Sequence, residues 1–116
     1  MEKCTFLPLT NIAGKKWTFA ILQQIALNNT LSFNVVHKKI LRITPKILSQ
    51  RLQELEKNQL IKKREKNTSR RTSYSLTQRG KEFYEILISM RKWNEKYLPI
   101  KQQCNNRECA SCPNLN

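Results

Sequence analysis

The order of its periodic segments is the feature that most constrains how this chain can fold. Apolar residues recur at helical spacing over residues 14–27, 32–40 and 45–57. Thr44 is a good N-cap for the third segment, and Pro45 follows it at the first helical position, where its missing N–H group costs nothing. We therefore expect three helices in the first half of the chain.

The helical period is lost after residue 60. Residues 60–66 and 72–77 form two short runs, and apolar and polar residues alternate in the second run. The turn between them is polar and basic, which is typical of a two-stranded hairpin with an exposed tip. Thr77 can cap a long last helix, and we expect Pro99 to stop it.

Helix, helix, helix, basic hairpin and helix is the order of a winged helix-turn-helix domain, mostly α with a small β-hairpin. In such a domain the third helix enters the major groove of DNA and the hairpin contacts phosphates or the adjacent minor groove. We expect residues 1–98 to form one DNA-binding and dimerisation domain. Residues 99–116 are then a cysteine-containing C-terminal tail.

The charge of the chain favours a nucleic-acid partner. Twenty-two Lys and Arg oppose eight acidic residues, for a net charge of +14. Such a field attracts polyanions, either nucleic acid or an anionic membrane surface. Residues 38–71 hold twelve of the basic residues and only three of the acidic ones, and this concentration favours nucleic acid. No apolar run approaches the ~18 residues of a membrane span, and no signal peptide is evident, so we expect a cytoplasmic protein without a membrane partner.

The third helix and the hairpin carry the candidate DNA contacts. Glutamine can bond adenine bidentately, and arginine or lysine can bond guanine, whereas cations at the hairpin tip suit phosphate. The candidates are Lys38, Thr44, Lys46, Ser49, Gln50, Arg51, Lys66, Arg70 and Arg71.

Each of these candidates also has a simpler explanation. Gln50 could be merely solvated, and Arg51 could be held in an ion pair with Glu54 three residues further on. Arg70 and Arg71 could serve only to keep an exposed turn soluble. The predicted elements are therefore better supported than any single contact.

The last helix has an apolar stripe that predicts a helical partner. Four of its apolar residues recur at spacings of 4, 3 and 7, close to the period of a helix packed against another helix. A role in the core of a single chain and a role in a dimer seam both fit, and the length of the helix favours the seam. The predicted dimer-interface residues are Trp17, Phe83, Leu87, Met90, Trp93 and Tyr97.

Three stretches, "GKKWTFAIL", "ITPKILSQRLQELEKNQLIKKR" and "YSLTQRGKEF", carry a family resemblance. They fit the patterns G-x-K-W, S/T-P-K-x-L-x-x-R-L-x-x-L-E and Y-x-L-T-x-x-G. The chain resembles the HxlR-type transcriptional regulators, winged-helix proteins related to MarR, over roughly residues 4–98. The matching residues are Gly14, Lys16, Trp17, Thr44, Pro45, Lys46, Leu48, Arg51, Leu52, Leu55, Glu56, Tyr74, Leu76, Thr77 and Gly80.

This resemblance implies a homodimer held by its first and last helices and bound to a near-palindromic operator in double-stranded DNA. Many members of the family have a cysteine at the position of Cys4, and in some it senses electrophiles or oxidants. In this chain Thr5 stands where the family usually has proline after that cysteine. The resemblance implies nothing about the cysteines of the tail.

Cys104, Cys109 and Cys112 form the pattern C-x4-C-x2-C in the tail, and Cys4 lies at the opposite end of the chain. If the first and last helices pack together, Cys4 could approach the three tail thiols. Four sulfur ligands suit zinc or an iron–sulfur cluster. Reversible thiol sensing and no special role remain alternatives, and zinc and iron–sulfur cannot be separated from the sequence.

Two other function classes compete with a sequence-specific regulator. A nonspecific architectural nucleic-acid-binding protein would need only the positive charge. An enzyme, such as a thiol oxidoreductase, has little support, because the chain has no Asp, one His and no glycine-rich phosphate loop. We therefore expect a dimeric, sequence-specific regulator tuned by metal, cluster or thiol state, and no enzyme.

Overall fold

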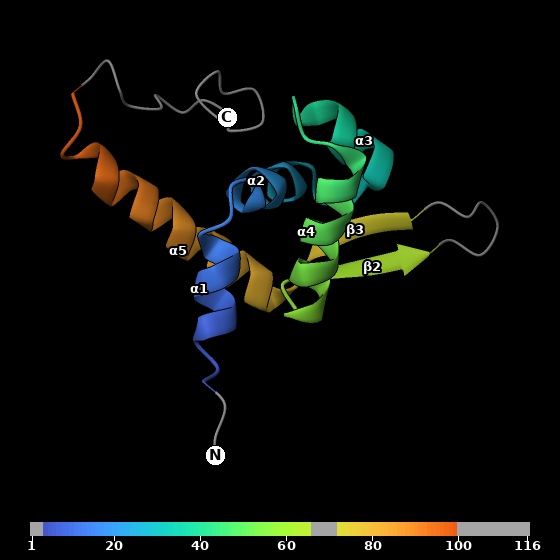
Figure 1. The fold of residues 1–116 in the computed structure, drawn as a ribbon, viewed down its shortest axis with the longest axis horizontal. Coiled ribbons are helices and arrows are strands. Elements are labelled where there is room, and N and C mark those ends of the chain that lie inside the picture. The colour runs from blue at the N-terminus through green and yellow to red at the C-terminus, as the bar shows by residue number, and fades with distance from the viewer. Residues whose placement is uncertain (1–3, 66–71, 100–116) are drawn as a thin grey trace.

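The computed structural model describes residues 4–65 and 72–99 of the chain. These residues form five helices and a three-stranded antiparallel sheet, and a long C-terminal helix extends away from the sheet (Figure 1). The elements are α1 (Leu7–Ala13), α2 (Thr18–Asn28), β1 (Leu31–Ser32), α3 (Phe33–Lys39), α4 (Pro45–Lys57), β2 (Ile61–Glu65), β3 (Thr72–Leu76) and α5 (Gln78–Glu95).

The N-terminal region differs from the prediction. The sequence predicted one helix from about residue 14, but α2 begins at Thr18 and a separate helix, α1, precedes it. Pro8 lies in the first turn of α1, where proline is tolerated, and the helix ends at the cap residue Gly14. A helix of seven residues is too short to show a clear apolar period, which is why the pattern did not reveal it.

Both helices of the helix-turn-helix begin at the residues where the periodic segments 32–40 and 45–57 place them, and each has a side-chain cap. The hydroxyl of Ser32 accepts a hydrogen bond from the Val35 N–H at 3.3 Å, and this bond starts α3. The hydroxyl of Thr44 accepts from the Ile47 N–H at 3.2 Å and starts α4. Both caps satisfy donors that an isolated helix leaves unpaired, so these helix starts are confirmed.

The predicted hairpin is present as β2 and β3, which pair from Ile61↔Leu76 to Glu65↔Thr72. A two-residue strand, β1, adds to the other edge of β3 through the pair Leu31↔Tyr74. The strand order β1-β3-β2 makes β2 an edge strand. The sequence did not predict β1, because two residues cannot show the alternation that identifies a strand.

The start of α5 is confirmed and its end is shorter than expected. The Thr77 hydroxyl accepts from the Gly80 N–H at 2.9 Å, as an N-cap does. The helix ends at Glu95, before Pro99, and the next residues form a tighter turn in which the Leu98 N–H donates to the Glu95 carbonyl at 3.2 Å. Such tightening is common at helix ends.

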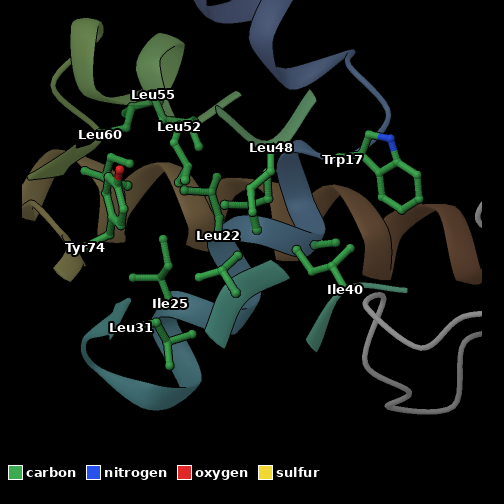
Figure 2. Packing of buried hydrophobic residues seen from close by; sticks show 14 of the residues in the cluster. Trp17, Leu22, Ile25, Leu31, Ile40, Leu48, Leu52, Leu55, Leu60 and Tyr74 are labelled. Atoms are coloured by element: carbon green, nitrogen blue, oxygen red, sulfur yellow. The ribbon is translucent and has the colours of Figure 1, made fainter. Parts of the chain in front are cut away.

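One core joins α2, the helix-turn-helix and the sheet, and it also includes Ile12 of α1 and Leu87 of α5. Figure 2 shows side chains of α2 and α4 meeting in this core, with Ile40, the residue after α3, and Leu60 and Tyr74 from the hairpin region also part of it. Leu48, Leu52 and Leu55 are at most 2% exposed, so the predicted apolar stripe of α4 faces the core. The opposite side of α4 is left for solvent or a partner.

No described helix is both long enough and apolar enough to cross a membrane. The core cluster extends along the chain from Ile12 to Leu87. The predicted division at residues 98 and 99 stays a prediction, because nearly all of the proposed tail lies outside the described residues.

Candidate nucleic-acid interface

The outer face of α4 is polar along its length. Its exposed residues and its buried leucines lie on opposite sides of the helix, as a period of 3.6 residues requires. Thr44, Lys46 and Gln50 are exposed and Ser49 is half-buried. The first two turns therefore offer a hydroxyl, a cation and an amide, which are the groups that read base edges and phosphates.

Lys38 lies exposed in the last turn of α3, the first helix of the helix-turn-helix. Its position suits the usual role of that helix, which crosses the DNA backbone while the second helix enters the groove. Lys38 and the exposed face of α4 thus belong to consecutive elements of one motif.

Arg51 is engaged within the protein. One of its terminal nitrogens, Nη1, donates to both carboxylate oxygens of Glu54, at 2.8 and 2.9 Å. The Arg51 side chain is only 16% exposed. The structure thus contains the ion pair with Glu54, and the DNA contact of Arg51 stays a prediction.

Glu54 also binds a second cation from a distant part of the sequence. The Lys15 Nζ lies 2.8 Å from Glu54 Oε1, which ties α4 to the connection between α1 and α2. Burial would raise the pKa of Glu54, but the hydrogen bonds and charges of Lys15 and Arg51 outweigh it and lower the pKa below 4.5. Glu54 is therefore ionised at neutral pH and holds both cations in place.

The described part of the wing, the β2–β3 hairpin, carries basic residues that were not among the predicted DNA contacts. Lys62, Lys63 and Arg64 are all exposed on the edge strand β2. Charged side chains on an edge strand discourage pairing with other sheets and can also contact phosphates. The predicted contacts are Arg70 and Arg71 at the hairpin tip and Lys66 on its approach, and these three lie outside the described residues. The three consecutive basic residues from Lys62 to Arg64 could have predicted this basic strand from the sequence.

Of the six predicted dimer residues, two are buried, three are exposed and one is half-buried. Trp17 and Leu87 are buried in the core of the single chain, at 8% and 6% exposure, so they have almost no surface to offer a partner. Leu87 is buried on α5, which packs against α2 within the chain. Met90, Trp93 and Tyr97 are 56%, 59% and 74% exposed.

Phe83, the remaining predicted dimer residue, is half-buried, whereas the exposed Ile86 was not selected. Ile86 and Met90 are four residues apart and so share a face of α5. The outer half of α5 also borders an open groove of about 410 Å³, whose lining includes Phe19, Met90 and Trp93. Exposed apolar side chains thus gather on this part of α5.

Cys4 is exposed and forms no disulfide with a described residue. Cys104, Cys109 and Cys112 lie outside the described residues. Within residues 4–65 and 72–99, no three His, Cys, Asp or Glu side chains gather in a group that could hold a metal ion. The predicted four-sulfur site for zinc or an iron–sulfur cluster therefore stays a prediction.

Comparison with known proteins agrees with this geometry. An uncharacterised HTH-type transcriptional regulator of Bacillus subtilis, YdzF, is 32% identical over 84 residues, which cover 72% of this chain and 77% of that protein. A crystal structure of a MarR-family regulator from Enterococcus faecalis superposes with a TM-score of 0.70 at 27% identity, covering 84% of this chain and 91% of that one.

The oxidised redox regulator HypR has the same fold, with a TM-score of 0.69 at 22% identity over 84% of this chain and 100% of that one. The HxlR-like helix-turn-helix family model matches residues 12–102, which include the helix-turn-helix, the wing and α5. The chain therefore belongs to the HxlR-like helix-turn-helix family and is a DNA-binding transcriptional regulator with a winged helix-turn-helix fold.

Proposed function

We propose that this protein acts in the cytoplasm as a homodimer that binds a near-palindromic operator in double-stranded DNA and is not an enzyme. The observation that carries the proposal is the polar outer face of α4, which lies opposite the buried face formed by Leu48, Leu52 and Leu55. A helix held in this way can enter a major groove without losing its own core contacts.

Base recognition is assigned to the first half of α4. Gln50 can bond adenine through its amide, and Lys46 can bond guanine or a phosphate, with Thr44 and Ser49 beside them. Arg51 supports this surface indirectly, because its guanidinium and Glu54 fasten the middle of α4. Lys15 extends the same support to the region that precedes α2.

The wing is assigned to the DNA backbone. Lys62, Lys63 and Arg64 form the described part of a basic strand, and the predicted contacts Lys66, Arg70 and Arg71 follow along the chain. Phosphate contacts raise affinity for any duplex and fix its orientation. We therefore expect the wing to raise the affinity for any duplex and α4 to provide the preference between sequences.

Dimerisation is assigned to the exposed apolar side chains of α5. Met90, Trp93 and Tyr97 expose large apolar side chains on one helix, and the ring centroids of Trp93 and Tyr97 lie 5.5 Å apart. Covering them with a second copy would remove this area from water. Two reading helices held about 34 Å apart, one turn of DNA, would then meet the two halves of an operator.

The cysteines are assigned to regulation. Cys4 precedes α1 and Cys104, Cys109 and Cys112 follow α5 in the sequence, so thiols occur on both sides of the helices that the family resemblance assigns to the dimer. Metal or cluster occupancy, or thiol oxidation, alters DNA affinity if it stabilises one dimer geometry over another. The exposure of Cys4 supports access by an oxidant.

The deciding experiment first selects a preferred duplex from random sequences and then measures its affinity beside a scrambled duplex across a range of salt concentrations. A sequence-specific regulator retains a preference of about 10³-fold or more, whereas a nonspecific architectural protein binds both duplexes equally and with the same salt slope. Equal binding of the two duplexes at every salt concentration would reject the proposed function.

A further inference from the structure

The turn that joins α3 to α4 is held on both sides by buried residues. Ile40 and Ile43 are 1% and 5% exposed, so both anchor the turn in the core. The His37 Nε2 lies 3.2 Å from the carbonyl oxygen of Ile43, which can only accept a hydrogen bond, so the ring donates to it. Leu41 and Arg42 lie exposed between the two isoleucines. The neighbours of Arg42 therefore fix its backbone conformation, while its side chain is left at the surface.

The backbone of Arg42 has a conformation that arginine disfavours. Its φ is 71°, in the left-handed region, where the Cβ of an L-residue comes too close to the following carbonyl oxygen. Glycine adopts this region freely, and asparagine does so more readily than other side chains. Among the described residues, the other non-glycine positions with positive φ are Asn29 and Gln59. Asn29 is of the type that tolerates such a φ.

The end of α4 explains the positive φ of Gln59. The Gln59 N–H donates to the Glu56 carbonyl and the Leu60 N–H donates to the Leu55 carbonyl, both at 2.9 Å. This pair of bonds is the Schellman motif, which ends a helix on a left-handed residue. Arg42 does not directly follow the cap of α3, so this motif does not account for it. A strained, exposed residue within a binding motif points to a role for its side chain.

Arg42 belongs to a part of the sequence that has no acidic side chains. From residue 3 to residue 53 the chain contains neither Asp nor Glu. Lys38 and Lys39 are exposed in the last turn of α3, and Lys46 is exposed in the first turn of α4. With Arg42, four exposed cations thus lie on the segment 38–46. This segment leads into the end of α4 that enters the major groove in a helix-turn-helix.

We propose that Arg42 is a further DNA contact, whose guanidinium binds a phosphate at the edge of the groove that α4 enters. This inference rests on the proposed function, because it takes α4 as the reading helix. When the first turn of α4 reaches base edges, the turn before it passes the backbone that borders the groove. The Arg42 side chain brings a charge and several donors to that backbone, whereas the glycine that would suit its φ brings none. The phosphate contact thus explains why an arginine occupies a strained position.

Arg42→Gly and Gln59→Gly, made in the full chain, test the contact as a matched pair. The two positions lie at opposite ends of α4, a helix of 13 residues and so about 20 Å long. Neither variant should lower the urea midpoint of unfolding, because glycine suits a positive φ. Arg42→Gly should weaken binding of the preferred and the scrambled duplex alike, by about 3- to 10-fold, and reduce the salt slope by about one unit. Gln59→Gly should leave the affinity within about twofold and the salt slope unchanged.

Two further variants separate the charge of residue 42 from its backbone. Arg42→Lys keeps the charge and should keep the wild-type salt slope, whereas Arg42→Gln should lose as much slope as Arg42→Gly. A wild-type slope in both Arg42→Gly and Arg42→Gln would overturn the proposal, and so would weaker binding of only one duplex, which would indicate a base contact. Failure of the proposed function is a different result, because the wild type itself would then bind both duplexes equally. The salt slopes of the variants still reveal a lost phosphate contact in that case.

Discussion

The backbone carbonyl of Leu60 lies against Gly80, in the space that a Cβ atom would need if residue 80 were not glycine. A Cβ built on Gly80 would overlap the Leu60 oxygen and lie 2.9 Å from the carbonyl carbon. The Thr77 N–H donates to that same oxygen at 3.1 Å, and the Thr77 hydroxyl donates to the Gln59 carbonyl at 2.6 Å. The first turn of α5 is thus fastened to the chain segment between α4 and β2.

This close approach predicts that Gly80→Ala lowers the free energy of unfolding by about 3 kcal/mol, because backbone atoms must move apart. Gly14→Ala is the matched control, since Gly14 has a φ of −82° and its Cβ would lie 3.3 Å from its nearest neighbour, the Thr10 oxygen. That change should stay within about 1 kcal/mol. Urea denaturation measures both variants, and equal losses would contradict the structural difference.

The ion pairs of Glu54 predict a pH-dependent contribution to stability. Glu54→Gln should lower the free energy of unfolding by about 1 kcal/mol at pH 7, because Lys15 and Arg51 lose their shared partner. The folded-state pKa of Glu54 is lowered below 4.5, so this stabilisation is complete above pH 4.5 and is lost as the pH falls through the lowered value.

Denaturant curves of the wild type and Glu54→Gln between pH 7 and acid conditions should therefore converge as the pH falls. Glu82→Gln serves as the control, since Glu82 is exposed and forms no ion pair with a described residue. If the difference in the free energy of unfolding between wild type and Glu54→Gln stays constant with pH, the charge of the Glu54 carboxylate is not the source of the stabilisation.

The two tryptophans should respond differently to truncation. Trp17→Ala should lower the free energy of unfolding by about 3–5 kcal/mol, because Trp17 is buried within the chain. Trp93→Ala should change the stability of the folded chain much less, because Trp93 is exposed in the single chain. It should weaken dimerisation by at least about tenfold, because the proposed dimer would bury this aromatic side chain.

Analytical ultracentrifugation over a range of protein concentrations measures the dimerisation, and Lys92→Ala, an exposed neighbour on α5, is the control. If Trp93→Ala and Lys92→Ala dimerise equally well, the exposed face of α5 is not the seam.

Gln50 and Arg70 should affect DNA binding in different ways. Gln50→Ala should change the preference between operator variants by about 1–3 kcal/mol at the contacted base, because an amide can discriminate base edges. Arg70→Ala should weaken all duplexes by a similar factor and reduce the salt slope by about one unit. Competition binding with a panel of operator variants separates these effects, and identical behaviour of the two variants would refute the division between α4 and the wing.

The cysteine hypothesis predicts a change in DNA affinity when the thiols are oxidised or metal is removed. The triple variant Cys104→Ser/Cys109→Ser/Cys112→Ser should lose any response to a chelator, and Cys4→Ser shows whether the fourth thiol takes part. Anaerobic purification, an absorption spectrum and elemental analysis distinguish zinc, iron–sulfur and free thiols. If oxidant, chelator and the triple substitution all leave DNA affinity unchanged, the cysteines do not regulate binding.

Local signals explain why much of the fold could be predicted. Ser32, Thr44 and Thr77 each have an oxygen suited to capping a helix, and each does so in the structure. These interactions span three residues, so they can be recognised in a short window of sequence. Where the local signal was weak, as in the seven residues of α1 and the two of β1, the prediction failed.

The sequence alone therefore determined the order of the main helices and the hairpin, because caps and apolar periods act over a few residues. Only the tertiary structure decided that Glu54 binds Lys15, 39 residues away, and that Trp17 and Leu87 belong to the core of one chain. An apolar stripe has the same period whether it packs within a chain or against a partner. Whether the stripe packs inside one chain or in a dimer interface depends on which surfaces come together, and only the packing of the whole chain fixes those surfaces.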